Sequence, residues 1–245
     1  MLTYFIENAS SYGQDIDSLF SLVTVLAGFW FILAELVLFY FIFRFRRKKD
    51  KPAQYITGEK KKEMKWIKIP HHLILVCDVF IVIGAIYVWI EVKQDSPPID
   101  EEIRIIGQQW AWSFVQPGPD GLLDTDDDIS TVDTLHIKVN TVYRFHLESE
   151  DVMHSFSVPV FRLKQDAVPG RIITGWFEAI KEGEFDIQCT EMCGIGHGVM
   201  AARIIIESEE KHNEWMTAST SKASSTEMLA DTTSKKNKTR QKQNG

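Results

Sequence analysis

Two cysteines, a histidine and a methionine fall within twelve consecutive residues in the second half of the chain. They stand in the stretch Cys189-Thr-Glu-Met-Cys193-Gly-Ile-Gly-His197-Gly-Val-Met200. Thiolate, imidazole and thioether groups are the ligands that suit copper, zinc or iron–sulfur clusters. The glycines among them let the backbone fold tightly around a bound group. We expect a further, distant ligand in His154, which begins a predicted strand.

This ligand set fits more than one kind of metal site. A single blue-copper ion would use one cysteine, two histidines and a weak axial methionine, and one cysteine would be spare. Two bridging cysteines could instead hold two copper ions, each with one histidine. Met200 would then be the axial ligand of one ion, and a backbone carbonyl, that of Glu191, would serve the other. Two such ions share one electron, so bond lengths change little on reduction.

Zinc and redox chemistry are the alternatives to copper. A structural zinc ion would use the two cysteines and the two histidines, but it would leave Met200 idle. A redox dithiol lacks the usual C-x-x-C spacing. The chain has three cysteines in all, so a disulfide framework is excluded. The residues therefore favour copper, with zinc as the alternative.

Two long apolar runs precede the ligand region. Residues 21–43 and 69–90 are each long enough to cross a hydrocarbon core of about 30 Å as a helix. We predict a two-helix transmembrane hairpin over 18–93. Glu35 interrupts the first run and Asp78 the second, and we expect each acid to face a partner subunit and find a hydrogen bond there.

The charge of the connecting segment predicts the orientation of the hairpin. Residues 44–68 carry eleven basic and three acidic side chains, and positive loops stay on the cytoplasmic side. Both ends of the chain should therefore lie on the opposite side. Residues 1–17 lack the basic start of a cleavable signal peptide, so we interpret them as an N-terminal outer segment.

The polar part of the chain is predicted to be rich in strands. After a linker at Pro97 and Pro98, alternating and β-branched runs separated by turn residues indicate a small antiparallel sandwich or barrel. The predicted strands are 103–114, 134–139, 142–147, 154–158, 171–177, 183–188 and 201–206.

The charge of the polar region indicates which class of partner it binds. Residues 69–208 hold twenty-two acidic and nine basic side chains, which disfavours nucleic acid and favours a basic protein partner. The same acidity could serve solubility alone. Residues 209–245 are rich in Ser, Thr, Lys and Asn, and we predict a disordered tail there.

The ligand pattern C-x-E-x-C-x-x-x-H-x-x-M, after two N-terminal spans, resembles the CuA subunit (subunit II) of haem–copper cytochrome c oxidases. Three further stretches are similar to the same family. They are 150–159 around His154, the turn 166–171, and the aromatic segment 107–114 with Trp110 and Trp112. The resemblance runs from about residue 15 to residue 208.

The resemblance implies a membrane-anchored all-β protein, in which a two-helix hairpin is followed by a cupredoxin-like Greek-key β-barrel domain over 94–208. It implies two copper ions in a binuclear CuA centre, bridged by the two cysteines. The implied copper ligands are His154, Cys189, the backbone carbonyl of Glu191, Cys193, His197 and Met200. The Glu191 side chain is also implied to bind a magnesium ion shared with subunit I.

The implied function is electron transfer. The family accepts electrons from cytochrome c, or from a tethered cytochrome c domain, and passes them to the haem centres of subunit I for oxygen reduction coupled to proton pumping. Subunit III is a further implied partner. Trp110 matches the tryptophan through which electrons pass in. The chain has no C-x-x-C-H motif, so haem is expected only in the partner subunit.

The family also implies a location. We expect the bacterial inner membrane, with the N-terminus and the CuA domain on the periplasmic side, in preference to the mitochondrial inner membrane.

Two other function classes are a quinol-oxidase subunit, in which the ligands would be missing, and a membrane-anchored copper carrier, which would need an exposed site.

Several acids could serve the partners. Candidates for docking cytochrome c are Glu150, Asp151, Asp120, Asp124 and Asp126. The acidic loop 117–128 is longer than expected for the family and lacks the full signature of a calcium loop. Glu63 resembles the family's glutamate at the entrance of a proton channel, or is a surface charge among lysines. The chain departs from the family at Phe156, often Trp, and at Ala111, often aromatic.

Overall fold

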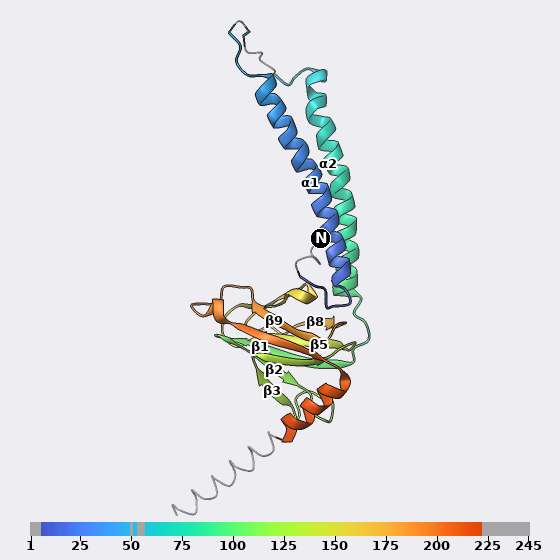
Figure 1. Ribbon diagram of the computed structural model, residues 1–245, viewed down its shortest axis with the longest axis vertical. Helices are drawn as coiled ribbons and strands as arrows, with labels where there is room; N and C mark the ends of the chain where they lie inside the picture. The colour runs from blue at the N-terminus through green and yellow to red at the C-terminus, as the bar shows by residue number, and fades with distance from the viewer. Residues whose placement is uncertain (1–5, 50, 53–56, 222–245) are drawn as a thin grey trace, which may run out of the picture. The chain divides into compact units, whose positions relative to one another are not determined.

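The chain divides into two compact units. The computed structural model describes residues 6–49, 51–52 and 57–221 (Figure 1). One unit is Gln14–Asp95, and the other combines Ile6–Gly13 with the residues from Ser96 onward. The first five residues and the tail 222–245 lie outside the described part of the chain.

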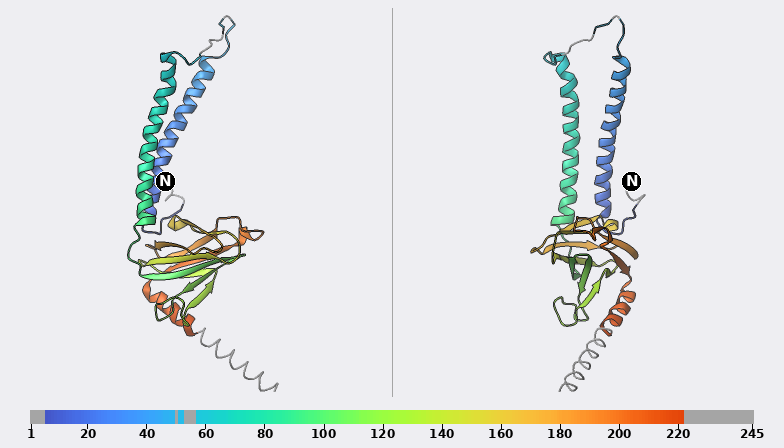
Figure 2. Two further views of the ribbon diagram at one scale, coloured as in Figure 1. Left: turned by 180° about the vertical axis from the view of Figure 1, so that it is seen from behind. Right: turned by 90° about the vertical axis from the view of Figure 1, so that its left-hand side faces the viewer.

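The first unit is a pair of long helices. Helix α1 (Gly13–Arg44) and helix α2 (Lys61–Trp89) run antiparallel, and α2 continues into a π-helical turn, η2 (Ile90–Gln94) (Figure 2). Both helices are long and apolar enough to cross a membrane. In the apolar 18-residue window of each helix, the share of residues that are buried is 0% for the first helix and 6% for the second. The two predicted long apolar helices are confirmed. The prediction of a loop over 44–68 is wrong at its end, because residues 61–68 already belong to α2.

The two helices approach each other at Cys77 and at Gly84 of α2. The Trp30 indole lies 3.5 Å from the Cys77 sulfur. A Cβ atom on Gly84 would lie 3.3 Å from Leu19, so this glycine marks a close approach of α2 to α1. Hydroxyls on the apolar helix donate to the carbonyl four residues back, as Thr24 does at 2.7 Å. The helices therefore satisfy these polar groups internally.

The second unit is a β-sandwich of two five-stranded sheets (Figure 1). The strand order of one sheet is β3-β2-β1-β5-β8 and that of the other is β4-β10-β9-β6-β7. The strands are β1 (Glu101–Gln108), β2 (Ala111–Gln116), β3 (Ile129–Val132), β4 (Thr134–Lys138), β5 (Val142–Ser149), β6 (His154–Val158), β7 (Leu163–Ala167), β8 (Ile173–Glu178), β9 (Gly183–Cys189) and β10 (Ala201–Glu207).

The predicted cupredoxin-like all-β class is confirmed, with one correction to the strand pairing. A purely antiparallel arrangement was expected, but β1 pairs with β5 and β10 pairs with β4 in parallel. Parallel neighbours need a crossover connection, and such a connection leaves no short hairpin signal in the sequence. The sandwich therefore depends on contacts between distant segments.

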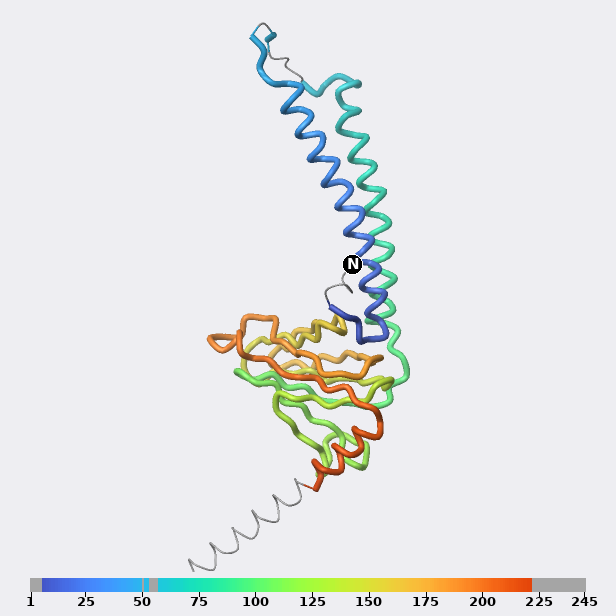
Figure 3. The backbone as a smooth tube through the Cα atoms, viewed as in Figure 1, coloured from blue at the N-terminus to red at the C-terminus, as the bar shows by residue number. Residues whose placement is uncertain are grey.

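Three local predictions also need correction. The single strand predicted over 103–114 is a hairpin, because the chain turns at Gln109–Trp110 and Gln108 pairs with Ala111. Strands β3 and β7 were not predicted. Residues 209–221, predicted as part of a disordered tail, form a helix that follows β10 (Figure 3).

Packing against the sandwich explains the C-terminal helix. The His212 side chain is only 1% exposed. The Trp215 ring stacks on His136 of β4, with 4.2 Å between the ring centroids. The helix is thus stabilised by buried aromatic surface, which its polar composition does not predict.

The core of the sandwich consists of inward-facing aromatic and aliphatic side chains. Burial alternates along β2 and β5, as expected for strands with one face on the core. Phe177 of β8 touches several rings, with centroid distances of 5.7 Å to Tyr143, 6.1 Å to Phe145 and 5.3 Å to Phe161. These rings form a continuous layer between the sheets.

Residues Ile6–Gly13 belong to the sandwich unit. Ser10 forms an isolated antiparallel bridge with Ala179, and the Ala9 amide donates to the Val160 carbonyl at 2.9 Å. The Tyr12 ring meets Trp176 edge-on at 5.1 Å. Part of the predicted outer segment 1–17 therefore completes the sandwich as an extra edge.

Replacement of Phe177 by alanine should destabilise the sandwich by about 3–5 kcal/mol, because a fully buried ring is lost and a cavity remains. The measurement is denaturant unfolding of the detergent-solubilised chain, followed by tryptophan fluorescence. Val132→Ala is the control: this side chain is 63% exposed, and its removal should change the free energy of unfolding by less than about 0.5 kcal/mol.

Candidate metal centre

Neighbouring strands bring the distant ligand to the ligand loop. Cys189 ends β9 and His154 begins β6. The two strands pair antiparallel with Phe156 opposite Cys189, so His154 lies beside the point where the chain leaves β9. The loop 190–200 then returns to β10 through a short 3-10 turn, η4 (His197–Val199), and places Met200 just before that strand.

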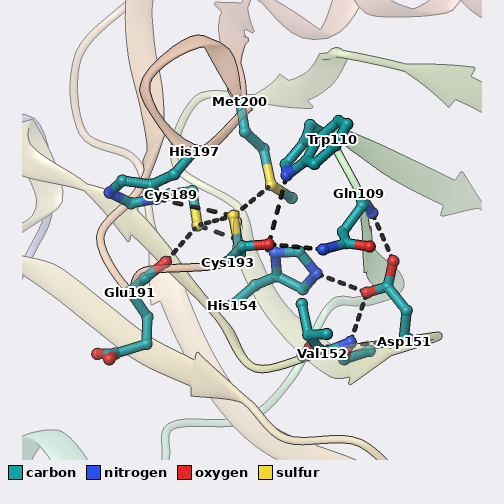
Figure 4. A network of polar contacts seen from close by, with 11 residues as sticks. Gln109, Trp110, Asp151, Val152, His154, Cys189, Glu191, Cys193, His197 and Met200 are labelled. Atoms are coloured by element: carbon teal, nitrogen blue, oxygen red, sulfur yellow. Dashed lines mark hydrogen bonds and ion pairs between the residues drawn. The ribbon is translucent and has the colours of Figure 1, made fainter. Parts of the chain in front are cut away.

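The predicted ligand atoms converge (Figure 4). The two cysteine sulfurs are 3.7 Å apart. The Cys189 sulfur is 3.9 Å from Nδ1 of His154 and 3.3 Å from the Glu191 carbonyl oxygen. The Cys193 sulfur is 3.7 Å from Nδ1 of His197 and 3.7 Å from the Met200 sulfur. Each cysteine sulfur thus has one imidazole and one weaker donor beside it.

The number of donor atoms distinguishes between the possible metal sites. A tetrahedral zinc ion takes four ligands. Here the Glu191 carbonyl and the Met200 sulfur are as close to the thiols as the two imidazoles are. Two ions bridged by both sulfurs would use all six donors, with one imidazole and one weak ligand for each ion. Soft sulfur donors suit copper in such an arrangement.

Four of the six donor residues are almost fully buried. Exposure is 8% for Cys189, 3% for Cys193, 2% for Met200 and zero for His154. Burial, together with the neighbouring Cys189 thiol, raises the pKa of Cys193 to about 11. At neutral pH this thiol keeps its proton until a metal ion displaces it.

Asp151 orients the distant imidazole. Its Oδ1 lies 2.8 Å from Nε2 of His154, so the ring carries its proton on Nε2 and presents Nδ1 to the sulfurs. Burial acts to raise the pKa of Asp151, but hydrogen bonds from His154, Gln109 and Val152 outweigh it and lower that pKa. Asp151, predicted for docking, thus has internal partners for both oxygens.

Trp110 lies against the ligand loop. Its indole Nε1 donates to the Cys193 carbonyl at 3.3 Å, and its side chain is still 39% exposed. A Cβ atom on Gly196 would lie 2.4 Å from the indole ring, so only glycine fits there. Trp112 is fully buried, with its ring 6.0 Å from that of His154. Of the two tryptophans, Trp112 is therefore the core residue.

The structure does not bring all the predicted site residues together. Glu150 is exposed next to Asp151. The acidic loop with Asp120, Asp124 and Asp126 follows the end of β2 that is opposite to Trp110, a strand length of about 20 Å away. Asp124 is paired there with Arg104.

Glu63 belongs to the helical unit, where it accepts a hydrogen bond from the Gly58 amide at 3.0 Å. One polar residue of the site was not predicted, Gln109, whose side-chain amide donates to the Cys193 carbonyl at 2.7 Å. The run Gln108-Gln109 gives no sign of which amide faces the loop, because that depends on where the hairpin turns.

Comparisons with known proteins agree on one family. The family model described as cytochrome c oxidase subunit II, periplasmic domain, matches residues 115–209. The chain is 31% identical over 233 residues to the alternative cytochrome c oxidase subunit 2 of Bradyrhizobium diazoefficiens, which covers 85% of this chain and 81% of that protein. It is 28% identical over 245 residues to cytochrome c oxidase subunit 2 of Cereibacter sphaeroides, with 87% and 79% covered.

One solved structure that matches this chain is the periplasmic domain of subunit II of cytochrome oxidase from Bradyrhizobium japonicum, with 29% identity and a TM-score of 0.47. The match covers 52% of this chain and 99% of that one.

If the two cysteine sulfurs bridge two copper ions, Cys193→Ser should abolish that centre, because one bridging sulfur would be lost. We expect two copper ions per natively assembled chain and a mixed-valence electron paramagnetic resonance spectrum with two equivalent metals, both absent in the variant. Cys77→Ser is the control, since Cys77 lies in α2 and not at the site. Recovery of one zinc ion and no copper would contradict the assignment.

Asp151→Ala should weaken copper retention by about 10–100-fold, the usual effect of removing the group that orients a ligating imidazole. Competition with a copper chelator measures this loss. Glu150→Ala, the exposed neighbour, should leave copper affinity unchanged. Equal retention in both variants would show that His154 needs no orienting carboxylate.

Proposed function

Because this chain belongs to the cytochrome c oxidase subunit II family, we propose that it is the electron-accepting subunit of a haem–copper oxidase. It takes electrons from cytochrome c and passes them to the haem centres of subunit I, where oxygen is reduced and protons are pumped. The observation that carries the proposal is the convergence of two thiols, two imidazoles, a thioether and a carbonyl, with Trp110 against the Cys193 carbonyl.

The chain supplies the surroundings that electron transfer requires. Two copper ions held by these ligands would accept and release one electron at a time. The buried sulfurs and the imidazole held by Asp151 would keep the ligand positions similar in both redox states, which would lower the reorganisation energy of electron transfer. The half-exposed Trp110 ring offers an apolar contact for the haem edge of a carrier and a short bonded route to Cys193.

The alternative of a copper carrier is less well supported. Delivery requires a site that exchanges its metal with a partner, and such a site is open. Here both cysteine sulfurs and the Met200 side chain are almost fully buried. A quinol-oxidase subunit is disfavoured because all the predicted copper ligands are present. Co-purification with a haem-containing large subunit distinguishes the oxidase subunit from the carrier.

We extend the proposal to magnesium. The Glu191 carbonyl faces the Cys189 sulfur, while its carboxylate points away from the sulfurs (Figure 4). A carboxylate suits a hard cation, so the side chain is free to bind magnesium at the boundary with subunit I. One residue would thus serve both the copper centre and the subunit boundary.

The proposal also covers the docking of the electron carrier, the orientation of the chain in the membrane and its further partners. Exposed Glu150 lies on the ligand side of the sandwich and is the best placed docking acid; Asp120, Asp124 and Asp126 would act only at longer range. The basic segment 44–68 favours the cytoplasmic side, so we infer a periplasmic sandwich in a bacterial inner membrane. Glu63, near the start of α2, would then lie on the cytoplasmic side as the entrance of a proton channel, and subunit III is a further partner.

Trp110→Ala should slow reduction by cytochrome c without removing copper. Truncation of a central aromatic contact costs about 2 kcal/mol or more, which is about thirtyfold in affinity. Stopped-flow reduction of the assembled oxidase, with copper analysis, measures both properties. Trp215→Ala, in the helix 209–221, is the control and should change neither. Unchanged reduction in the Trp110 variant would refute this route.

A further inference from the structure

One carbonyl of the ligand loop accepts two side-chain hydrogen bonds from the turn between β1 and β2. The amide Nε2 of Gln109 donates to the Cys193 oxygen at 2.7 Å, and Nε1 of Trp110 donates to the same oxygen at 3.3 Å. The bond from Gln109 is the shorter of the two. It fixes the carbonyl to which the indole also binds.

Gln109 also reaches the other ligand segment through its backbone. Its N–H donates to Oδ2 of Asp151 at 2.7 Å, and Oδ1 of Asp151 lies 2.8 Å from Nε2 of His154 (Figure 4). One residue of the turn therefore contacts the cysteine loop directly and the histidine ligand through one carboxylate.

The loop backbone packs directly on this turn. A Cβ atom on Gly194 would lie 3.0 Å from Nε2 of Gln109 and 3.2 Å from Nε1 of Trp110. There is thus no space between the turn and the loop. Ligands carried on loops need such a supporting layer, because loops are otherwise mobile and imprecise.

We propose that Gln109 is a positioning residue for electron acceptance, which holds the Cys193 carbonyl and the Trp110 indole in a fixed bonded contact. Electronic coupling falls steeply with every gap between bonded groups. Without the amide, the loop and the indole would separate for part of the time, and the fraction of productive encounters with the carrier would fall. This inference rests on the proposed function, because it concerns the route by which electrons reach the site.

The test uses the assembled oxidase with Gln109→Leu and Gln109→Glu. Leucine has a similar size but no donor, and the glutamate has the same shape with an oxygen in place of the amide nitrogen. Gln108→Leu is the matched control, because this exposed neighbour lies at the end of β1. Wild-type reduction by cytochrome c is measured first, and its absence would refute the proposed function and not the role of Gln109.

We expect both Gln109 variants to keep two copper ions per chain. Hydrogen exchange of the amides in 194–199 should rise about fivefold, which corresponds to the loss of one hydrogen bond. The maximal rate of reduction by cytochrome c should fall by a similar factor at unchanged KM. Reduction by a small outer-sphere reagent, which does not need Trp110, should change less than about twofold.

Four results would overturn the proposal. A rise in KM alone would make Gln109 a docking contact for the carrier. Loss of copper, or an equal fall with both reductants, would make it a structural residue. Unchanged exchange and unchanged reduction in both variants would mean that Trp110 alone holds the loop.

Discussion

Two buried thiol groups with sulfurs 3.7 Å apart are the constraint on which the rest of this structure depends. Such thiols cannot both ionise without a counter-charge, and burial raises the pKa of Cys193 to about 11. A bound cation would supply that charge, and two imidazoles, a thioether and a carbonyl lie beside the sulfurs to complete its surroundings. Such an arrangement requires precise backbone positions.

The sandwich provides those positions from segments far apart in the chain. Strands β6 and β9 lie side by side, so a histidine from one and a cysteine from the other meet at the same end. The hairpin β1–β2 presents its turn to the same end, where Gln109 and Trp110 hold the Cys193 carbonyl. The predicted ligands, the orienting Asp151 and the Trp110 ring thus come from three separate connections between strands of one core.

The helical unit has a different physical basis. Its two helices are apolar on all sides and leave nearly all of that surface uncovered. Such helices need a hydrocarbon environment or partner helices. Glu35 and Asp78 interrupt these surfaces, and a partner subunit would give them hydrogen bonds. The strongly acidic sandwich, by contrast, needs water and suits a basic carrier.

The sequence by itself determined the ligand types, the two spans and the all-β class, because each depends on short-range spacing, length or alternation. Tertiary structure decided what depends on long-range pairing. Residues 103–114 form a hairpin, and its turn makes Gln109, and not Gln108, the residue whose side chain donates to the Cys193 carbonyl. The length of β2 separates the acidic loop from Trp110. Tertiary structure also ordered residues 209–221 by packing aromatic rings against β4. Strand register and the docking of segments are set by contacts between distant residues, and no local pattern contains them.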